Sequence, residues 1–165
     1  ENMVLAYRRG QRRSLRRGIT SELRRMMRDR LSMLGLGLED RLQTPVGHLS
    51  GGQRQALTLL MATMARPELL LLDEHVAALD PNTAQQILQL TERIVTEERL
   101  TTLMVTHNME HALRMGDATI MMHEGQIVLN VSGWERAAMT VRDLLEKFSR
   151  VRGEQLLDDR VLLAT

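Results

Sequence analysis

The chain has 165 residues, 43% of them hydrophobic and only 2% aromatic, and its formal net charge is +1. This length allows one domain with a sizeable core, and the hydrophobic content argues against a disordered chain. The absence of cysteine excludes disulfides and thiolate chemistry, and the scarcity of aromatic residues argues against a surface that stacks single-stranded nucleic acid.

The N-terminal part is rich in arginine. Residues 2–9 fit a short amphipathic helix, and six arginines then crowd the ten positions from Arg8 to Arg17. This cluster has two interpretations, a patch for anionic lipid headgroups or nucleic acid, and a solvated loop without a partner. No apolar run approaches the roughly 20 residues that a membrane-spanning helix needs.

Two helices are predicted next. Leucines and methionines recur at helical spacing between Thr20 and Leu34, where Gly35 and Gly37 end the periodic segment. A connecting loop at 39–48 leads to Ser50, which can cap a second helix at 51–65.

The start of this second helix has the features of an anion site. Free amides and the helix dipole favour negative charge there, and Gly51 and Gly52 leave room for a phosphate beside the backbone. Ser50 and Gln53 add polar groups. The alternative is that Ser-Gly-Gly is only a turn, as most such sequences are.

An apolar run at 69–72 without alternation predicts a central parallel strand buried on both faces. Asp73 and Glu74 follow directly, at the end of the strand where open α/β sheets bind their ligands. Two carboxylates there are costly to bury unless a metal ion, water or substrate satisfies them.

The remaining segments alternate between helix and strand. Asp80 and Pro81 are a typical helix start, and His107 follows directly after a predicted strand, as Asp73 follows the strand before it. The expected elements are a helix at 81–99, a strand at 101–106, a short helix at 108–115, a hairpin of 118–122 and 126–131, a helix at 140–148 and a final helix within 151–165.

This pattern predicts an α/β core with a helical subdomain. We expect residues 1–66 to form the helical subdomain, 67–150 the α/β portion, and 151–165 a C-terminal tail helix.

Four motifs together resemble the ATP-binding subunits of ABC transporters. LSGGQRQ at 49–55 looks like the signature sequence, LLLLDE at 69–74 like Walker B, AALD at 77–80 like the D-loop, and VTHN at 105–108 like the switch histidine segment. The resemblance implies a P-loop NTPase (ABC ATPase) fold with an α-helical signature subdomain. The sequence around the motifs is most similar to that of ATPases from bacterial importers that use a lipoprotein binding subunit.

The resemblance also implies roles for single residues, with ATP and Mg²⁺ as cofactors. Asp73 would hold Mg²⁺ through water, Glu74 would act as general base or orient the attacking water, and His107 would contact the γ-phosphate. The residues that would close over ATP bound to the opposite subunit of a dimer are Ser50, Gly51, Gly52 and Gln53. Asp80 would reach across the dimer interface.

Three features depart from the family pattern. His75 stands where many members have Pro or Ala, and Ala77 stands where many have Ser in the D-loop. No G-x-x-x-x-G-K-[ST] phosphate loop is present, because the only lysine is Lys147. We therefore expect a core that is incomplete at its N-terminus, with the phosphate loop upstream of Glu1, and little ATP hydrolysis by these residues alone.

The function expected is ATP hydrolysis coupled to solute import. The expected partners are a second ATPase subunit in a head-to-tail dimer, transmembrane permease subunits and, indirectly, a substrate-binding protein. The expected location is peripheral, on the cytoplasmic face of the cell membrane. Two alternatives stay open, a truncated half without catalytic activity that works in trans with a complete ATPase, and an ABC ATPase outside transport. Nucleic acid is the least favoured partner.

Overall fold

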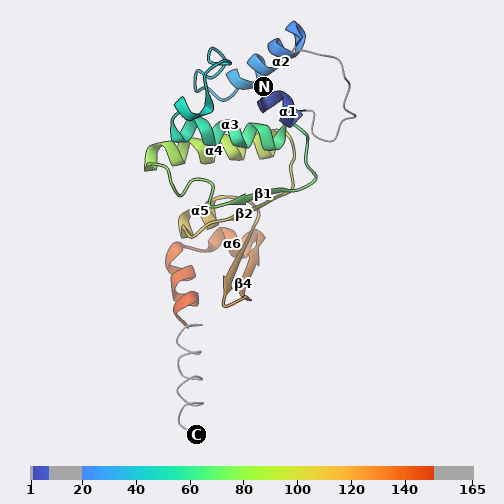
Figure 1. Cartoon of the computed structure of the whole chain (residues 1–165). Coiled ribbons are helices and arrows are strands. Elements are labelled where there is room, and N and C mark those ends of the chain that lie inside the picture. The colour runs from blue at the N-terminus through green and yellow to red at the C-terminus, as the bar shows by residue number, and fades with distance from the viewer. Residues whose placement is uncertain (1, 8–19, 151–165) are drawn as a thin grey trace. The chain divides into compact units, whose positions relative to one another are not determined.

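The computed structural model describes residues 2–7 and 20–150 (Figure 1). Contacts divide the chain into two compact units, Glu1–Val105 and Thr106–Thr165. The arginine cluster at 8–17 and the predicted tail helix at 151–165 lie outside the described residues. The predicted domain boundaries at 66 and 150 stay predictions.

The first unit begins with helices whose ends follow the local sequence. They are α1 (Asn2–Tyr7), α2 (Ser21–Ser32), the 3-10 turn η1 (Val46–His48), α3 (Gly51–Thr63) and α4 (Pro81–Glu97). Thr20 caps α2 by accepting a hydrogen bond from the amide of Leu23 at 3.2 Å. Gly35 and Gly37 have φ angles of 66° and 67°, a conformation that favours glycine, so they end this segment as predicted.

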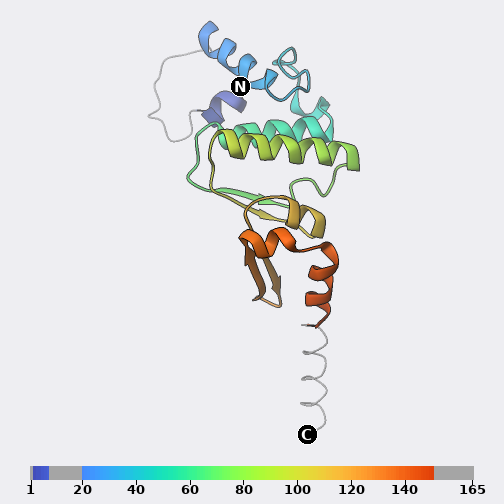
Figure 2. The same cartoon turned by 180° about the vertical axis from the view of Figure 1, so that it is seen from behind.

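Helices α3 and α4 lie side by side in both views (Figures 1 and 2). Their facing sides bury aliphatic residues at helical spacing, and α2 adds Met27 and Leu31 to the buried set. The buried aliphatic residues of α3 and α4 are Ala56, Leu57, Leu59, Leu60, Ile87, Leu88, Leu90 and Ile94. Helical spacing in the sequence predicts most of this set but not Leu59. It also places Met61, Met64 and Val95 inward, and these three are only half-buried.

Ion pairs join the carboxyl end of α4 to its neighbours. Glu98 pairs with Arg30 of α2 at 3.0 Å and with Arg66, just after α3, at 3.7 Å. Arg93 of α4 donates a hydrogen bond to the carbonyl of Met33. These interactions therefore join the carboxyl ends of α2, α3 and α4.

Strands β1 (Leu70–Asp73) and β2 (Thr102–Val105) pair in parallel, with Leu71 opposite Leu103 and Asp73 opposite Val105. Both views place the α3–α4 pair on one side of these strands (Figures 1 and 2). Leu70 and Leu72 are buried, whereas Leu71 is 65% exposed.

The prediction that this strand is buried on both faces is therefore wrong for the described residues. Leu103 and Val105 are exposed on the same face as Leu71, because successive side chains of a strand point to opposite faces and helices cover only one of them. The apolar run correctly predicted a strand, but its composition carries no information on which neighbours cover it.

The second unit is built around a hairpin. Its elements are α5 (Met109–Arg114), β3 (Ala118–His123), β4 (Gln126–Ser132), α6 (Gly133–Ala138) and a helix at 141–150. The hairpin turns through Glu124 and Gly125, whose φ angles are 48° and 78°. Two positive φ angles in a two-residue turn match the right-handed twist of paired antiparallel strands, so the predicted hairpin is confirmed.

The core of this unit is small and aliphatic. Leu129 and Val131 of β4 pack with Leu144, and methionines surround them. The helix at 141–150 starts with a capping box, in which Thr140 Oγ1 accepts from the Asp143 amide at 3.3 Å and the Asp143 carboxylate accepts from the Thr140 amide at 2.7 Å. The sequence predicts this cap, because Asp143 follows Thr140 at the capping-box spacing.

Arg136 of α6 joins three segments of the second unit. Its guanidinium donates to Thr119 Oγ1 at 2.9 Å and to the carbonyl of Met115 at 2.6 Å. The sequence did not predict α6, because six residues with one large apolar side chain, Trp134, show no helical period. Within the described ranges, no helix combines the length and the apolar character needed to cross a membrane.

Candidate functional site

The signature turn forms a complete capping box at the start of α3. Ser50 Oγ accepts from the Gln53 amide at 3.2 Å, and Gln53 Oε1 accepts from the Ser50 amide at 3.1 Å. Gln53 also donates from Nε2 to the carbonyl of Leu36 at 3.2 Å. Because the first amides of a helix have no acceptor inside the helix, Gly51 and Gly52 present their N–H groups at a positive helix end.

The two glycines also bring α3 close to the start of α4. A Cβ on Gly52 would overlap Cγ2 of Thr83, and a Cβ on Gly51 would lie 3.2 Å from Cδ2 of Leu79. Gly52 is buried. The sequence had suggested these glycines only as room for a phosphate; the structure gives them a packing reason that does not need a ligand.

Asp80 caps α4 and is solvent-exposed. Its Oδ1 accepts from the Thr83 amide at 3.0 Å. Hydrogen bonds from the Thr83 side chain and then from the Thr83 backbone hold the pKa of the Asp80 carboxyl below its ordinary value of 3.8. The same threonine therefore contacts the signature turn and the cap of α4.

Asp73 and Glu74 lie at the carboxyl end of the parallel pair. Asp73 is the last residue of β1, and the amide of Glu74 donates to the carbonyl of Val105 at 3.0 Å. Both carboxylates are exposed. The predicted position of these acids, at the strand end where α/β sheets bind ligands, is confirmed.

The backbone of Glu74 is left-handed, with φ at 43°. For a residue with a Cβ this conformation costs about 1–2 kcal/mol. Local hydrogen bonds hold it, because the Glu74 carbonyl also accepts from the Ala77 amide at 3.0 Å. The sequence gives no signal for this strain, since glutamate rarely adopts a positive φ.

The carboxylates at this strand end are oxygen ligands of the kind that Mg²⁺ takes. Among the described residues, no three His, Asp or Glu side chains come together as a metal cage. A single exposed carboxylate such as Asp73 is nevertheless the usual protein contribution to Mg²⁺, which keeps waters and takes its other ligands from phosphates.

His107 belongs to the second unit, where it is exposed in the turn between β2 and α5. The turn is ordered by its neighbours. The Asn108 amide donates to Thr106 Oγ1 at 3.1 Å, and Asn108 Oδ1 caps α5 by accepting from the His111 amide at 3.1 Å. The expected helix start after His107 is therefore confirmed, and the role of its imidazole stays a prediction.

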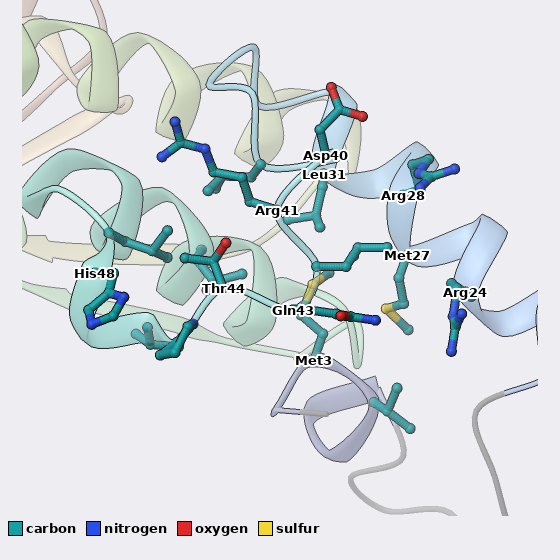
Figure 3. A pocket seen from close by; sticks show the side chains of 17 residues that line it. Met3, Arg24, Met27, Arg28, Leu31, Asp40, Arg41, Gln43, Thr44 and His48 are labelled. Carbon is teal, nitrogen blue, oxygen red and sulfur yellow. The ribbon is translucent and has the colours of Figure 1, made fainter.

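A cavity of about 1060 Å³ lies elsewhere in the first unit, among α1, α2 and the loop before the signature turn (Figure 3). Its walls include apolar side chains such as Met27 and Leu31, with the cationic Arg24, Arg28 and Arg41 also lining it. None of the residues predicted to handle ATP lines this cavity. The sequence gave no sign of it, because its lining combines α1 and α2 with a loop that has no periodic pattern.

The known proteins that are similar to this chain belong to the family that its motifs resemble. Residues 7–77 match the family model described as ABC transporter. The tyrosine transport ATP-binding protein of Clostridioides difficile is 46% identical over 151 residues, which is 90% of this chain and 59% of that protein. Residues 7–77 therefore belong to the ABC transporter family, and the chain as a whole is similar to its ATP-binding proteins.

Other members of the ABC family match over shorter stretches. The aliphatic sulfonates import ATP-binding protein SsuB 2 of Agrobacterium fabrum is 41% identical over 115 residues, covering 70% of this ABC chain and 44% of its own length. The chain thus spans about three fifths or less of these relatives.

The fold agrees with the family. A solved ABC transporter in an inward-facing conformation, described as of metal-chelate type, superposes with a TM-score of 0.68 at 23% identity, over 89% of this chain and 56% of the other. This ABC chain therefore has the α/β fold of a P-loop NTPase of the ABC type, as its motifs implied.

Proposed function

We propose that this chain supplies the signature helix, the catalytic carboxylates and the switch histidine of an ATP-hydrolysing subunit that drives solute import. The observation that carries the proposal is the parallel pairing of β1 and β2, because Asp73 and Glu74 lie at its carboxyl end, where α/β sheets generally bind their ligands. The importer assignment is supported by relatives named for tyrosine transport and aliphatic sulfonates import.

The chemistry expected of these residues is positioning and charge neutralisation. Asp73 would hold Mg²⁺ through water, and Glu74 would orient or deprotonate the attacking water. His107 would contact the γ-phosphate as a hydrogen-bond donor. When bound, Mg²⁺ would neutralise charge that develops on the phosphates during transfer.

The residues of the signature turn serve a second ATP. Ser50, Gly51, Gly52 and Gln53 close over the nucleotide held by the opposite subunit of a head-to-tail dimer, and Asp80 reaches across the interface. The free amides at the start of α3 support this role, because a phosphate can accept hydrogen bonds from them. The capped geometry of the turn supports it further, since a turn already held by hydrogen bonds would need little rearrangement to accept a phosphate.

Two inactive variants test the catalytic and the dimer proposals together. The natural polypeptide that contains these residues, at its full length, is prepared as Glu74→Gln and as Ser50→Asp. Aspartate keeps the N-cap but adds a negative charge that repels phosphate. Ser50→Asn is the matched control, because asparagine caps equally well without charge.

Each variant alone should hydrolyse ATP at least about 100-fold more slowly, whereas Ser50→Asn stays active. A mixture should recover about a quarter of the wild-type rate, because half the dimers then contain one site built from two intact surfaces. No recovery would mean that Ser50 and Glu74 serve one site within one subunit. Full activity of Glu74→Gln would support the alternative that this half has no catalytic role.

The permease is the proposed occupant of the cavity in Figure 3. The lining carries three arginines, Arg24, Arg28 and Arg41, against one carboxylate, Asp40. A short amphipathic helix with acidic residues, on the cytoplasmic side of the permease, therefore fits its apolar wall. The subunit is then held peripherally on the cytoplasmic face of the membrane. A substrate-binding protein acts on it only through the permease.

Charge reversal tests this contact. Arg28→Glu combined with Arg41→Glu should weaken co-purification with the permease and leave ATP hydrolysis by the detached subunit unchanged. Reversal of Arg54, an exposed arginine on α3 outside the cavity lining, is the control. Equal loss with Arg54→Glu would mean that general charge, and not the cavity, holds the permease.

A further inference from the structure

His75 follows Glu74 directly and its imidazole is anchored to α4. Nε2 of His75 lies 3.1 Å from Oγ1 of Thr91. Thr91 is only 1% exposed, and His75 is half-buried. This contact joins the turn after β1 to the interior of a long helix, 16 residues further along the chain.

The direction of this hydrogen bond follows from the second contact of Thr91. Its hydroxyl donates to the carbonyl of Ile87 at 2.8 Å. A hydroxyl has a single hydrogen, so Thr91 Oγ1 is the acceptor toward His75. Nε2 of His75 therefore carries a proton and donates it, which fixes the ring in one orientation.

The residue before His75 needs such an anchor. Glu74 has a positive φ of 43°, and strained conformations persist only where the surrounding structure fixes them. Its amide is held by Val105 and its carbonyl by Ala77. Both of these partners lie on β2 or in the turn itself, whereas the His75–Thr91 bond reaches the buried side of α4.

We propose that His75 is a positioning residue for ATP hydrolysis, acting through Thr91 to hold Glu74 in its left-handed conformation. The proposal rests on the function proposed above, in which Glu74 acts on the attacking water. The direction of the Cα–Cβ bond depends on φ, so a relaxed Glu74 would aim its carboxylate elsewhere. A general base must stay within hydrogen-bond reach of the proton it removes.

Paired substitutions test the hydrogen bond itself. His75→Ala and Thr91→Val each remove it, the second with almost no change in volume. His75→Gln and Thr91→Ser keep a donor and an acceptor and should restore function. The full-length natural polypeptide is used, and kcat and KM for ATP are measured separately.

We expect the two disruptive variants to lower kcat by about tenfold to a hundredfold, with KM for ATP changed less than about twofold. The double variant should be no slower than either single one, because both remove one bond. The proposal would be overturned if the kcat losses of the two single variants multiply in the double variant. It would also be overturned if neither conservative variant restores kcat.

A second measurement separates this proposal from the proposed function. Amide hydrogen exchange of Glu74 should speed up by more than about tenfold in His75→Ala and Thr91→Val, and stay near wild type in the conservative variants. Unchanged exchange would overturn the positioning role even if kcat falls. If Glu74→Gln retains full hydrolysis while exchange responds as expected, the function fails and the anchoring of Glu74 stands.

Discussion

Gly52 and Thr83 are in direct contact, and the contact leaves no room for a side chain at position 52. Gly52 lies in the first turn of α3 and Thr83 in the first turn of α4. The N-terminal turns of α3 and α4 are therefore packed directly against each other. The glycine that the family resemblance assigned to ATP is also required by the fold.

Replacing Gly52 by alanine should destabilise the chain by about 1–3 kcal/mol, because the new methyl group overlaps Cγ2 of Thr83. Urea unfolding measures this loss. Gly52→Ala combined with Thr83→Ser should recover most of the stability, since serine lacks that methyl group. Gly47→Ala is the control, because a Cβ there meets no atom within 4 Å. A loss that Thr83→Ser does not reduce would contradict the overlap.

The Asp80 cap should make stability sensitive to acid. The folded-state pKa of Asp80 is lowered from 3.8, so its stabilising contribution is present above that value and is lost as the pH falls through the lower folded pKa. NMR titration of the carboxyl carbon should give a midpoint below 3.8, and Asp80→Asn should keep the helix cap without this pH dependence. A midpoint above 3.8 would exclude the cap in solution.

Truncating a side chain on one face of β1 should lower the free energy of unfolding far more than truncating one on the other face. Leu72→Ala removes a buried side chain and should cost about 2–5 kcal/mol in the free energy of unfolding. Leu71→Ala, on the exposed face, should change it by less than about 0.5 kcal/mol. Chemical denaturation of both variants gives the comparison. Equal losses would mean that the exposed face is covered in solution.

In the second unit, Arg136→Lys should behave like a loss of Arg136. The guanidinium donates in two directions, to Thr119 Oγ1 and to the Met115 carbonyl, and an ammonium group cannot reproduce that fork. We expect about 1.5–3 kcal/mol of destabilisation by thermal or urea unfolding. Arg142→Lys is the matched control, because its ion pair with Glu146 is exposed. A lysine at 136 that preserves stability would show that charge alone suffices.

Local signals in the sequence predicted most of the elements. Caps at Ser50, Asp80 and Thr140 depend on side chains within three residues, so their hydrogen bonds can be inferred from spacing. The same holds for the hairpin at Glu124 and Gly125. The position of Asp73 and Glu74 followed from the order of strand and acid.

Contacts between distant segments could not be predicted in this way. The overlap that excludes a side chain at Gly52 involves a residue 31 positions later, and His75 meets Thr91 only because α4 folds back over the strand. Exposure of Leu71 was missed for the related reason that burial depends on which neighbours cover a face. None of these facts leaves a pattern in a short window of sequence.

The exposed row of aliphatic side chains on β1 and β2 has a practical consequence for handling the chain. Leu71, Leu103 and Val105 form an exposed apolar strip, and within the described part of the chain each strand has an unpaired outer edge. Such a surface adds further strands from neighbouring molecules as concentration rises. For these residues produced alone, this strip predicts self-association at high concentration, and Leu71→Lys should raise the concentration at which it begins.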